Sequence, residues 1–202
     1  MAARMMRIVI FAKAPVPGKV KTRLIPALGA EGAAGLAKQM LFTTCREALL
    51  AGIGKVELCF AHDPAWSGDL PSGVKVTDQG PGHLGERLTR AASRVTSEGD
   101  GIIFIGTDCP SLDARRIANA CHALDSNDAV LLPTFDGGYA LVGINRFDPS
   151  IFDGIAWSTS SVATDTIARF RALGWSLHIG DMLRDIDEPE DLSHLARSSE
   201  EA

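Results

Sequence analysis

The sequence contains no long apolar run. No stretch of its 202 residues approaches the roughly 20 consecutive apolar residues of a membrane span. The opening residues also lack the apolar segment and small-residue cleavage site of a secretory signal. The four cysteines include no CxxC pair and have no histidine partner at zinc-finger spacing, which favours buried thiols in a reducing compartment. We therefore expect a cytoplasmic protein without a membrane span.

Carboxylates are absent from the first thirty residues, which instead carry six cations: Arg4, Arg7, Lys13, Lys19, Lys21 and Arg23. The whole chain is acidic, with a formal net charge of −5, so positive charge is concentrated at one end. A general nucleic-acid-binding protein would be broadly basic, which argues against a nucleic-acid partner. A local excess of cations fits a small anionic ligand better.

Strand-like and helix-like segments alternate along the chain. The length fits one domain over residues 1–202, and a 46% hydrophobic composition is enough for a core. The expected strands are Arg7–Ala12, Lys55–Ala61, Val74–Thr77, Gly101–Gly106, Ala129–Pro133, Tyr139–Asn145 and Trp175–Ile179. The expected helices are Glu31–Leu50, Glu86–Ser97, Leu112–Leu124, Ser160–Leu173 and a short one from Pro189. This order predicts an α/β fold, with a mostly parallel sheet between helices and a ligand at the carboxyl ends of the strands.

The first candidate site is the loop AKAPVPGKVKTRL, which follows the apolar run Ile8–Phe11. Lysine and arginine side chains neutralise phosphate, and backbone N–H groups at the start of the next helix add positive potential. We expect Lys13, Gly18, Lys21 and Arg23 to bind the phosphates of a nucleotide. A solvated basic loop is the alternative interpretation.

Asp108 directly follows the buried strand Gly101–Ile105. Magnesium typically takes one or two protein carboxylates and completes its shell with phosphate oxygens and water. We therefore expect Asp108 to bind Mg²⁺ or Mn²⁺ beside the phosphates; a cap on the following turn is the alternative. A second carboxylate ligand is expected in the segment DIDEPED, with Asp187 preferred and Asp185 as the fallback.

The stretch QGPGHLGER contains the spacing GxGxxG. The preceding strand is short and Pro81 fills the turn, which argues against a dinucleotide fingerprint. We expect this loop to approach a nucleotide base or sugar, with Gln79 reading the base and Gly82 in backbone contact. A dinucleotide-binding oxidoreductase is retained as a minor alternative.

The segment Asp136-Gly137-Gly138-Tyr139 contains the only tyrosine of the chain. Paired glycines allow close approach of an acceptor, and Asp136 could orient an acceptor hydroxyl. We expect Gly137, Gly138, Tyr139 and Trp157 to line the acceptor site. An ordinary hairpin turn and a half-buried tryptophan explain the same residues.

Six motifs occur in the order AKAPVPGKVKTRL, QGPGHLGER, IGTDCPSL, FDGGY, WST and DIDEPEDL. In this order the chain resembles a glycosyltransferase-like bacterial family, the radical-SAM/selenodomain-associated transferases of type one. Its first and last motifs are also similar to those of 2-phospholactate guanylyltransferase and the molybdenum-cofactor nucleotidyltransferases. His83 is a departure, because many relatives carry an acid in the Gly-rich loop; we leave it out of the site.

The resemblance implies a three-layer fold of the glycosyltransferase-A type, found in nucleotide-diphospho-sugar transferases. It further implies a nucleotide held by Lys13, Lys21 and Arg23, and a divalent metal on Asp108 and Asp187.

Together these features predict a metal-dependent transferase that uses a nucleoside triphosphate or a nucleotide-sugar and an unknown small acceptor. Lys21, Arg23, Asp108 and Asp136 would act by positioning and charge neutralisation. The cation-rich loop favours nucleotidyl transfer, whereas the resemblance favours glycosyl transfer, and both reactions stay open. An alternative of another class is a nucleotide sensor without turnover.

Overall fold

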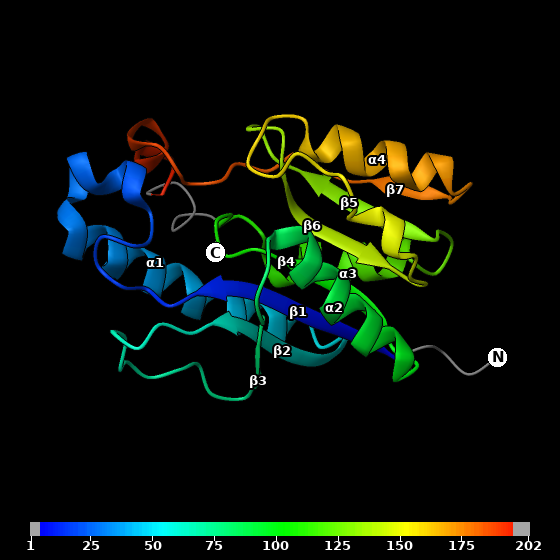
Figure 1. Cartoon of the computed structure of the whole chain (residues 1–202), viewed down its shortest axis with the longest axis horizontal. Helices are drawn as coiled ribbons and strands as arrows, with labels where there is room; N and C mark the ends of the chain where they lie inside the picture. The colour runs from blue at the N-terminus through cyan, green and yellow to red at the C-terminus, as the bar shows by residue number, and fades with distance from the viewer. Residues whose placement is uncertain (1–4, 196–202) are drawn as a thin grey trace.

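The structure is a computed structural model that describes residues 5–195 (Figure 1). Residues 1–4, with Arg4, and residues 196–202 lie outside the described part. The strands are β1 Met6–Lys13, β2 Gly54–Ala61, β3 Lys75–Asp78, β4 Gly101–Ile105, β5 Ala129–Pro133, β6 Tyr139–Ile144 and β7 Leu177–Ile179. The helices are α1 Ile25–Leu50, α2 Leu84–Ser97, α3 Ala114–Ala123 and α4 Val162–Ala172, with 3₁₀ turns η1 Thr22–Leu24, η2 Pro149–Ile151 and η3 Pro189–His194.

The strands form one sheet in the order β3-β2-β1-β4-β6-β5-β7. Strand β1 is parallel to β2 and β4, β2 to β3, and β5 to β7. Strand β6 is antiparallel to both of its neighbours because it returns from β5 through a tight hairpin. The predicted, mostly parallel sheet is therefore confirmed, and the loops after β1, β4 and β5 leave the same edge, which we call the ligand edge.

Helices cover both faces of the sheet, so the fold has three layers (Figure 1). Ile8 and Ile10 of β1 pack in the core cluster that contains Leu41 of α1. Val9, between them, belongs to the opposite cluster with Leu88 of α2. Successive side chains of a strand point to opposite faces, so a strand buried on both sides is apolar throughout, as β4 is.

Most element boundaries differ from the prediction by one or two residues, and two of the differences have a specific cause. Helix α1 is assigned from Ile25, but Gly29 (φ 71°, ψ 166°) is not helical, so a first turn with Pro26 at its start is joined through a kink to the helix that the sequence predicts from Glu31. The last strand begins at Leu177 rather than Trp175, because the Trp175 ring stacks on Phe170 at 5.7 Å. Among residues 5–195, no helix is both long enough and apolar enough to cross a membrane.

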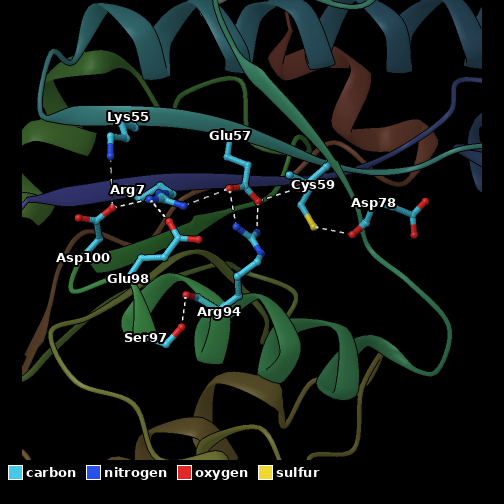
Figure 2. Close-up of polar contacts among 10 residues, drawn as sticks. Arg7, Lys55, Glu57, Cys59, Asp78, Arg94, Ser97, Glu98 and Asp100 are labelled. Atoms are coloured by element: carbon cyan, nitrogen blue, oxygen red, sulfur yellow. Dashed lines mark hydrogen bonds and ion pairs between the residues drawn. The ribbon is translucent and has the colours of Figure 1, made fainter.

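A network of charged side chains joins α2 to the sheet (Figure 2). Arg94 of α2 bonds both carboxylate oxygens of Glu57 in β2, whose side chain is 1% exposed. Arg7 of β1 lies 3.6 Å from Glu57 and pairs with Glu98 at 2.7 Å and Asp100 at 2.5 Å. Arg7 is near the amino end of its strand, so the network lies away from the ligand edge.

Candidate functional site

Residues 183–188, which we call the crossing segment, run over the ligand edge. The Leu183 N–H donates to the Pro133 carbonyl at 2.8 Å, and the Phe135 N–H donates back to Leu183 at 3.2 Å. Farther on, the Ile186 N–H donates to the Asp108 carbonyl at 2.8 Å. The segment is thereby fixed to the loops after β5 and β4, which lie far from it in the sequence.

The side chain of Ile186 anchors the crossing segment. It is 2% exposed and packs with Leu24 and with Ala33 and Met40 of α1. Figure 1 shows α1 and the C-terminal part of the chain at the same end of the molecule. This packing fixes the positions of the flanking acids, Asp185 and Asp187, relative to the first loop.

Lys21 lies at the centre of the site. Its Nζ pairs with the Asp108 carboxylate, donates to the Ile186 carbonyl at 2.6 Å and lies 3.6 Å from Asp187 Oδ1. The side chain is 7% exposed, and the backbone adopts the left-handed conformation (φ 46°, ψ 42°), which is uncommon outside glycine. Lys21 thus joins the first loop, the β4 loop and the crossing segment.

Arg23 extends this cluster toward solvent. One of its guanidinium nitrogens lies 3.0 Å from Asp187 Oδ2 and 3.1 Å from Glu188 Oε1, and its side chain is 61% exposed. Arg23 and Asp108 are therefore parts of one connected group, through Asp187 and Lys21. We call Lys21, Arg23, Asp108 and Asp187 the edge cluster.

The other predicted residues of the first loop lie beside the edge cluster. Lys13 is exposed at the end of β1 and makes no ion pair with the rest of residues 5–195. Lys19 pairs with Asp63 at 2.6 Å and is 58% exposed. Gly18 forms the turn with a φ of 79°, which favours glycine.

Asp108 and Asp187 fit a divalent metal that is completed by phosphate. Both carboxylates flank one ammonium group and stay partly exposed, at 55% and 39%. Across the described part of the chain, no three His, Cys, Asp or Glu side chains are placed to hold a metal together. Magnesium needs only one or two protein carboxylates when phosphate oxygens fill its shell, so two carboxylates agree with that arrangement.

Asp185, two residues before Asp187, takes no part in these ion pairs. Burial raises the pKa of the Asp185 carboxyl, and the nearby carboxylate of Asp136 raises it further. The thiol of Cys109 lies in the same region, and burial followed by the charge of Asp108 raises its pKa. A thiol held neutral is a packing group rather than a nucleophile.

Asp136 organises the hairpin between β5 and β6. Its Oδ1 accepts from the Thr134 hydroxyl at 2.5 Å and from the Gly138 N–H at 2.9 Å, which is an ordinary Asx-type turn. Oδ2 receives no hydrogen bond from residues 5–195. Gly137 has a φ of 88°, and a Cβ there would lie 2.1 Å from the Ser160 carbonyl oxygen. The two glycines thus allow the turn to contact the start of α4, while one Asp136 oxygen stays available.

Tyr139 and Trp157 point inward in the structure. Both side chains pack against the core cluster between the sheet, α2 and α4. Trp157 Nε1 is buried with no hydrogen-bond partner among the described residues, and the Tyr139 hydroxyl is buried beside Thr166. Burial raises the pKa of Tyr139. Acceptor binding by these two residues stays a prediction.

The Gly-rich loop is fixed by its own side chains. The Gln79 amide nitrogen donates to the carbonyls of Ala12 at 3.0 Å and Cys59 at 2.9 Å, and its oxygen accepts from Arg87 at 3.1 Å. The side chain would have to break these bonds to read a base. Gly82 has a φ of 96°, which favours glycine, and a Cβ there would also displace the end of the Glu86 side chain.

His83 begins α2, a role that the sequence analysis missed. Its Nδ1 accepts from the Glu86 N–H at 3.4 Å, while Glu86 Oε2 accepts from the His83 N–H at 2.9 Å. This reciprocal pair is a capping box, which satisfies backbone donors at a helix start. The sequence did contain a signal for this cap, because His83 stands three positions before Glu86, where a capping box usually has serine or threonine.

A groove of about 1010 Å³ lies between α2 and η2, beside the Gly-rich loop. Its lining includes Gly82, His83, Arg90 and Asp153. None of the edge cluster lines it. The groove is therefore separate from the edge cluster, although both adjoin loops that follow parallel strands.

Comparisons with known proteins agree with this fold. Residues 44–159, more than half of the chain, match the family described as "Uncharacterized protein conserved in bacteria (DUF2064)". No curated protein matches the sequence.

Solved structures share the fold. A provisionally assigned nucleotide-diphospho-sugar transferase from Desulfovibrio desulfuricans G20 is 28% identical with a TM-score of 0.88, over 98% of this chain and 88% of that one. CMP:2-keto-3-deoxy-manno-octonic acid synthetase complexed with CTP is 14% identical with a TM-score of 0.63, over 99% and 100%. Rv0371c from Mycobacterium tuberculosis H37Rv, in complex with manganese, is 16% identical with a TM-score of 0.53, over 97% and 100%. The predicted glycosyltransferase-A-like fold is confirmed.

Proposed function

The chain belongs to the DUF2064 family, and we propose that it is a metal-dependent transferase acting on a nucleoside triphosphate or a nucleotide-sugar. The observation that carries the proposal is the edge cluster, in which two cations of the first loop meet Asp108 and Asp187. A cation-rich loop, paired carboxylates and a ligand edge are the parts that phosphate transfer requires. The association with radical-SAM and selenodomain proteins stays a prediction.

The phosphates of the donor would lie over the first loop. Arg23 is exposed and Lys13 has no ion-pair partner within residues 5–195, so both have N–H donors to offer. The turn η1 and the first residues of α1 follow at once, and their backbone N–H groups add positive potential. The solved relative bound to CTP supports a triphosphate, and the relative named as a nucleotide-diphospho-sugar transferase supports a nucleotide-sugar.

Asp108 and Asp187 would hold Mg²⁺ or Mn²⁺, and the relative solved with manganese supports such a metal. When bound, the metal supplies positive charge that neutralises the phosphate oxygens during transfer. The contribution of the chain is to hold the two carboxylates at a fixed separation through the anchored Ile186.

We propose that Asp136 orients the acceptor and receives its proton. Its Oδ1 is used by the hairpin, and its Oδ2 receives no hydrogen bond from the described residues. A free carboxylate oxygen can orient an acceptor hydroxyl and take its proton. Since Cys109 is buried and neutral, direct transfer to the acceptor is favoured over an enzyme-bound intermediate.

The two candidate reactions differ in their leaving groups. In nucleotidyl transfer the acceptor oxygen attacks the α-phosphorus and pyrophosphate leaves. In glycosyl transfer the acceptor attacks the sugar carbon and a nucleoside diphosphate leaves. Arg23 and Lys13 favour the more highly charged triphosphate, and therefore nucleotidyl transfer, whereas the 28% identical relative favours glycosyl transfer.

A binding screen tests the proposal. Thermal unfolding would be followed with each nucleoside triphosphate and a set of nucleotide-sugars, with Mg²⁺, with Mn²⁺ and with EDTA. A ligand at 100 times its dissociation constant stabilises a protein by about 2.7 kcal/mol, which such a measurement resolves. We expect stabilisation by one donor class that requires the metal. Stabilisation only by NAD(P) would favour the oxidoreductase, and donor binding without product from any acceptor would favour the sensor.

A further inference from the structure

The ammonium group of Lys21 faces three acceptors of the protein itself. An ammonium has three N–H donors. Those of Lys21 face the Asp108 carboxylate, the Ile186 carbonyl at 2.6 Å and Asp187 Oδ1 at 3.6 Å. The nearest partners of the ammonium are therefore protein groups, and in this structure Lys21 neutralises two carboxylates.

Lys21 also differs from its neighbours in exposure. The side chains of Lys19 and Arg23 are 58% and 61% exposed, whereas that of Lys21 is 7% exposed. The carboxylates of Asp108 and Asp187 remain open to solvent on their other sides. Lys21 therefore approaches the two carboxylates from within the protein, while a ligand approaches them from solvent.

Lys21 neutralises the two carboxylates that would bind the proposed metal. Asp108 and Asp187 would repel each other without a cation between them, and the ammonium removes that repulsion. A divalent cation at the same carboxylates would lie next to the ammonium, and the two positive charges would repel. The two carboxylates therefore have a resident cation of the protein itself, and a metal has to compete with it.

From these contacts we propose that Lys21 is an exchangeable internal cation. It holds Asp108 and Asp187 together when no nucleotide is bound and moves away from them when a nucleotide arrives with its metal. The phosphates then offer the ammonium new negative partners, which the metal alone does not. This inference rests on the proposed function and adds an order to it: the nucleotide and the metal bind together, and the metal binds weakly alone.

The test is Mn²⁺ binding to the full chain without nucleotide, followed through the electron paramagnetic resonance signal of free Mn²⁺. Lys21→Met removes the charge and keeps an unbranched side chain of similar length. Lys21→Gln removes the charge but keeps an N–H donor for the Ile186 carbonyl, so it protects the fold. Lys21→Arg keeps the charge, and Lys19→Met removes a charge from the same loop outside the edge cluster.

We expect Lys21→Met and Lys21→Gln to bind Mn²⁺ about tenfold or more tightly than the unaltered protein, since the competing charge is gone. Lys21→Arg and Lys19→Met should bind it as the unaltered protein does. Adding Asp108→Asn to Lys21→Gln should abolish the gain, which would locate the ion between the two carboxylates. The proposal is overturned if a folded Lys21→Gln protein gains no Mn²⁺ affinity.

These outcomes separate the inference from the proposed function. If nucleotides bind with metal but neither neutral variant gains Mn²⁺ affinity, the exchange is wrong and the transferase proposal stands. If no nucleotide binds while both neutral variants gain Mn²⁺ affinity, the resident cation is supported and the proposed donor class is wrong.

Discussion

Arg94 and Glu57 form a two-point ion pair between α2 and the sheet (Figure 2). The carboxylate of Glu57 is 1% exposed, and it also accepts from the Thr77 hydroxyl at 2.7 Å. A buried carboxylate is tolerated only when its charge is paired and its oxygens are hydrogen-bonded. The pair therefore fixes how α2, and with it the Gly-rich loop, sits on β2.

Glu57→Gln should reduce the free energy of unfolding by about 3 kcal/mol, because it leaves Arg94 and Arg7 without their shared buried carboxylate. Urea unfolding followed by circular dichroism measures this. Glu98→Gln is the matched control: its side chain is 45% exposed, so water screens its charge and its loss should be clearly smaller than that of Glu57→Gln. Equal losses in the two variants would contradict the special role of Glu57.

The fold could be predicted because its signals are local. Continuous apolar runs such as Gly101–Ile105 mark strands that are buried on both faces, and the alternation of strands and helices leaves few arrangements. Boundaries were less predictable where a tertiary contact decides them, as for Trp175, which stacks on Phe170 instead of extending β7. The Arg94–Glu57 pair had no sequence signal, because nothing local indicates which charges become buried neighbours.

Part of the candidate site could be predicted for the same reason. Parallel strands end at one edge, so a basic loop after β1 and an acid after β4 were expected to meet, and Lys21 does contact Asp108. The direction of individual side chains could not be predicted. Lys21 faces two carboxylates, and the Gln79 amide faces the backbone of Ala12 and Cys59, because packing decides orientation.

Asp108→Asn should abolish metal-dependent stabilisation by the nucleotide while leaving the fold intact. Asparagine has nearly the shape of aspartate but cannot supply the negative charge that a divalent metal needs. Thermal unfolding with and without nucleotide and metal measures both effects. Asp125→Asn is the control, because the Asp125 side chain is 79% exposed and pairs with His122 rather than with a residue of the edge cluster. Unchanged metal-dependent stabilisation in Asp108→Asn would remove this residue from the metal site.

Arg23→Ala should weaken binding of a nucleoside triphosphate about tenfold, since a hydrogen bond between charged groups contributes roughly 1.5–3 kcal/mol. Binding of the corresponding monophosphate should change little, because the exposed guanidinium would reach the outer phosphates. Calorimetric titration of both ligands gives the comparison. An equal loss for the two ligands would instead assign Arg23 a structural role through Asp187 and Glu188.

The contribution of Asp128 to stability should depend on pH. The Ser176 backbone N–H, at 2.9 Å, lowers the pKa of the Asp128 carboxyl below its ordinary 3.8, helped by the Ser176 hydroxyl and Arg146. A carboxyl whose pKa is lower in the folded than in the unfolded state stabilises the protein at pH values above its unfolded-state pKa. This stabilisation is lost as the pH falls through the folded-state pKa. Asp128→Asn should therefore destabilise the protein at pH 7, and the difference should shrink below about pH 4. Urea unfolding across this range checks the sign, and a difference that grows toward low pH would contradict it.

Gly137→Ala should destabilise the protein by about 1–3 kcal/mol, a range typical of a backbone held in a sparsely populated conformation. Its φ of 88° is strained for alanine, and the added Cβ would lie 2.1 Å from the Ser160 carbonyl oxygen, which is backbone and cannot move aside easily. Gly35→Ala is the matched control, because Gly35 lies in α1 with no atom within 4 Å of a Cβ. Gly35→Ala should stabilise the protein by about 0.4–1 kcal/mol, since alanine loses less conformational freedom than glycine on folding. Urea unfolding measures both changes in the free energy of unfolding, and opposite signs would support the close approach of the Asp136 turn to α4. A Gly137→Ala protein as stable as the original would instead show that the turn and α4 are farther apart.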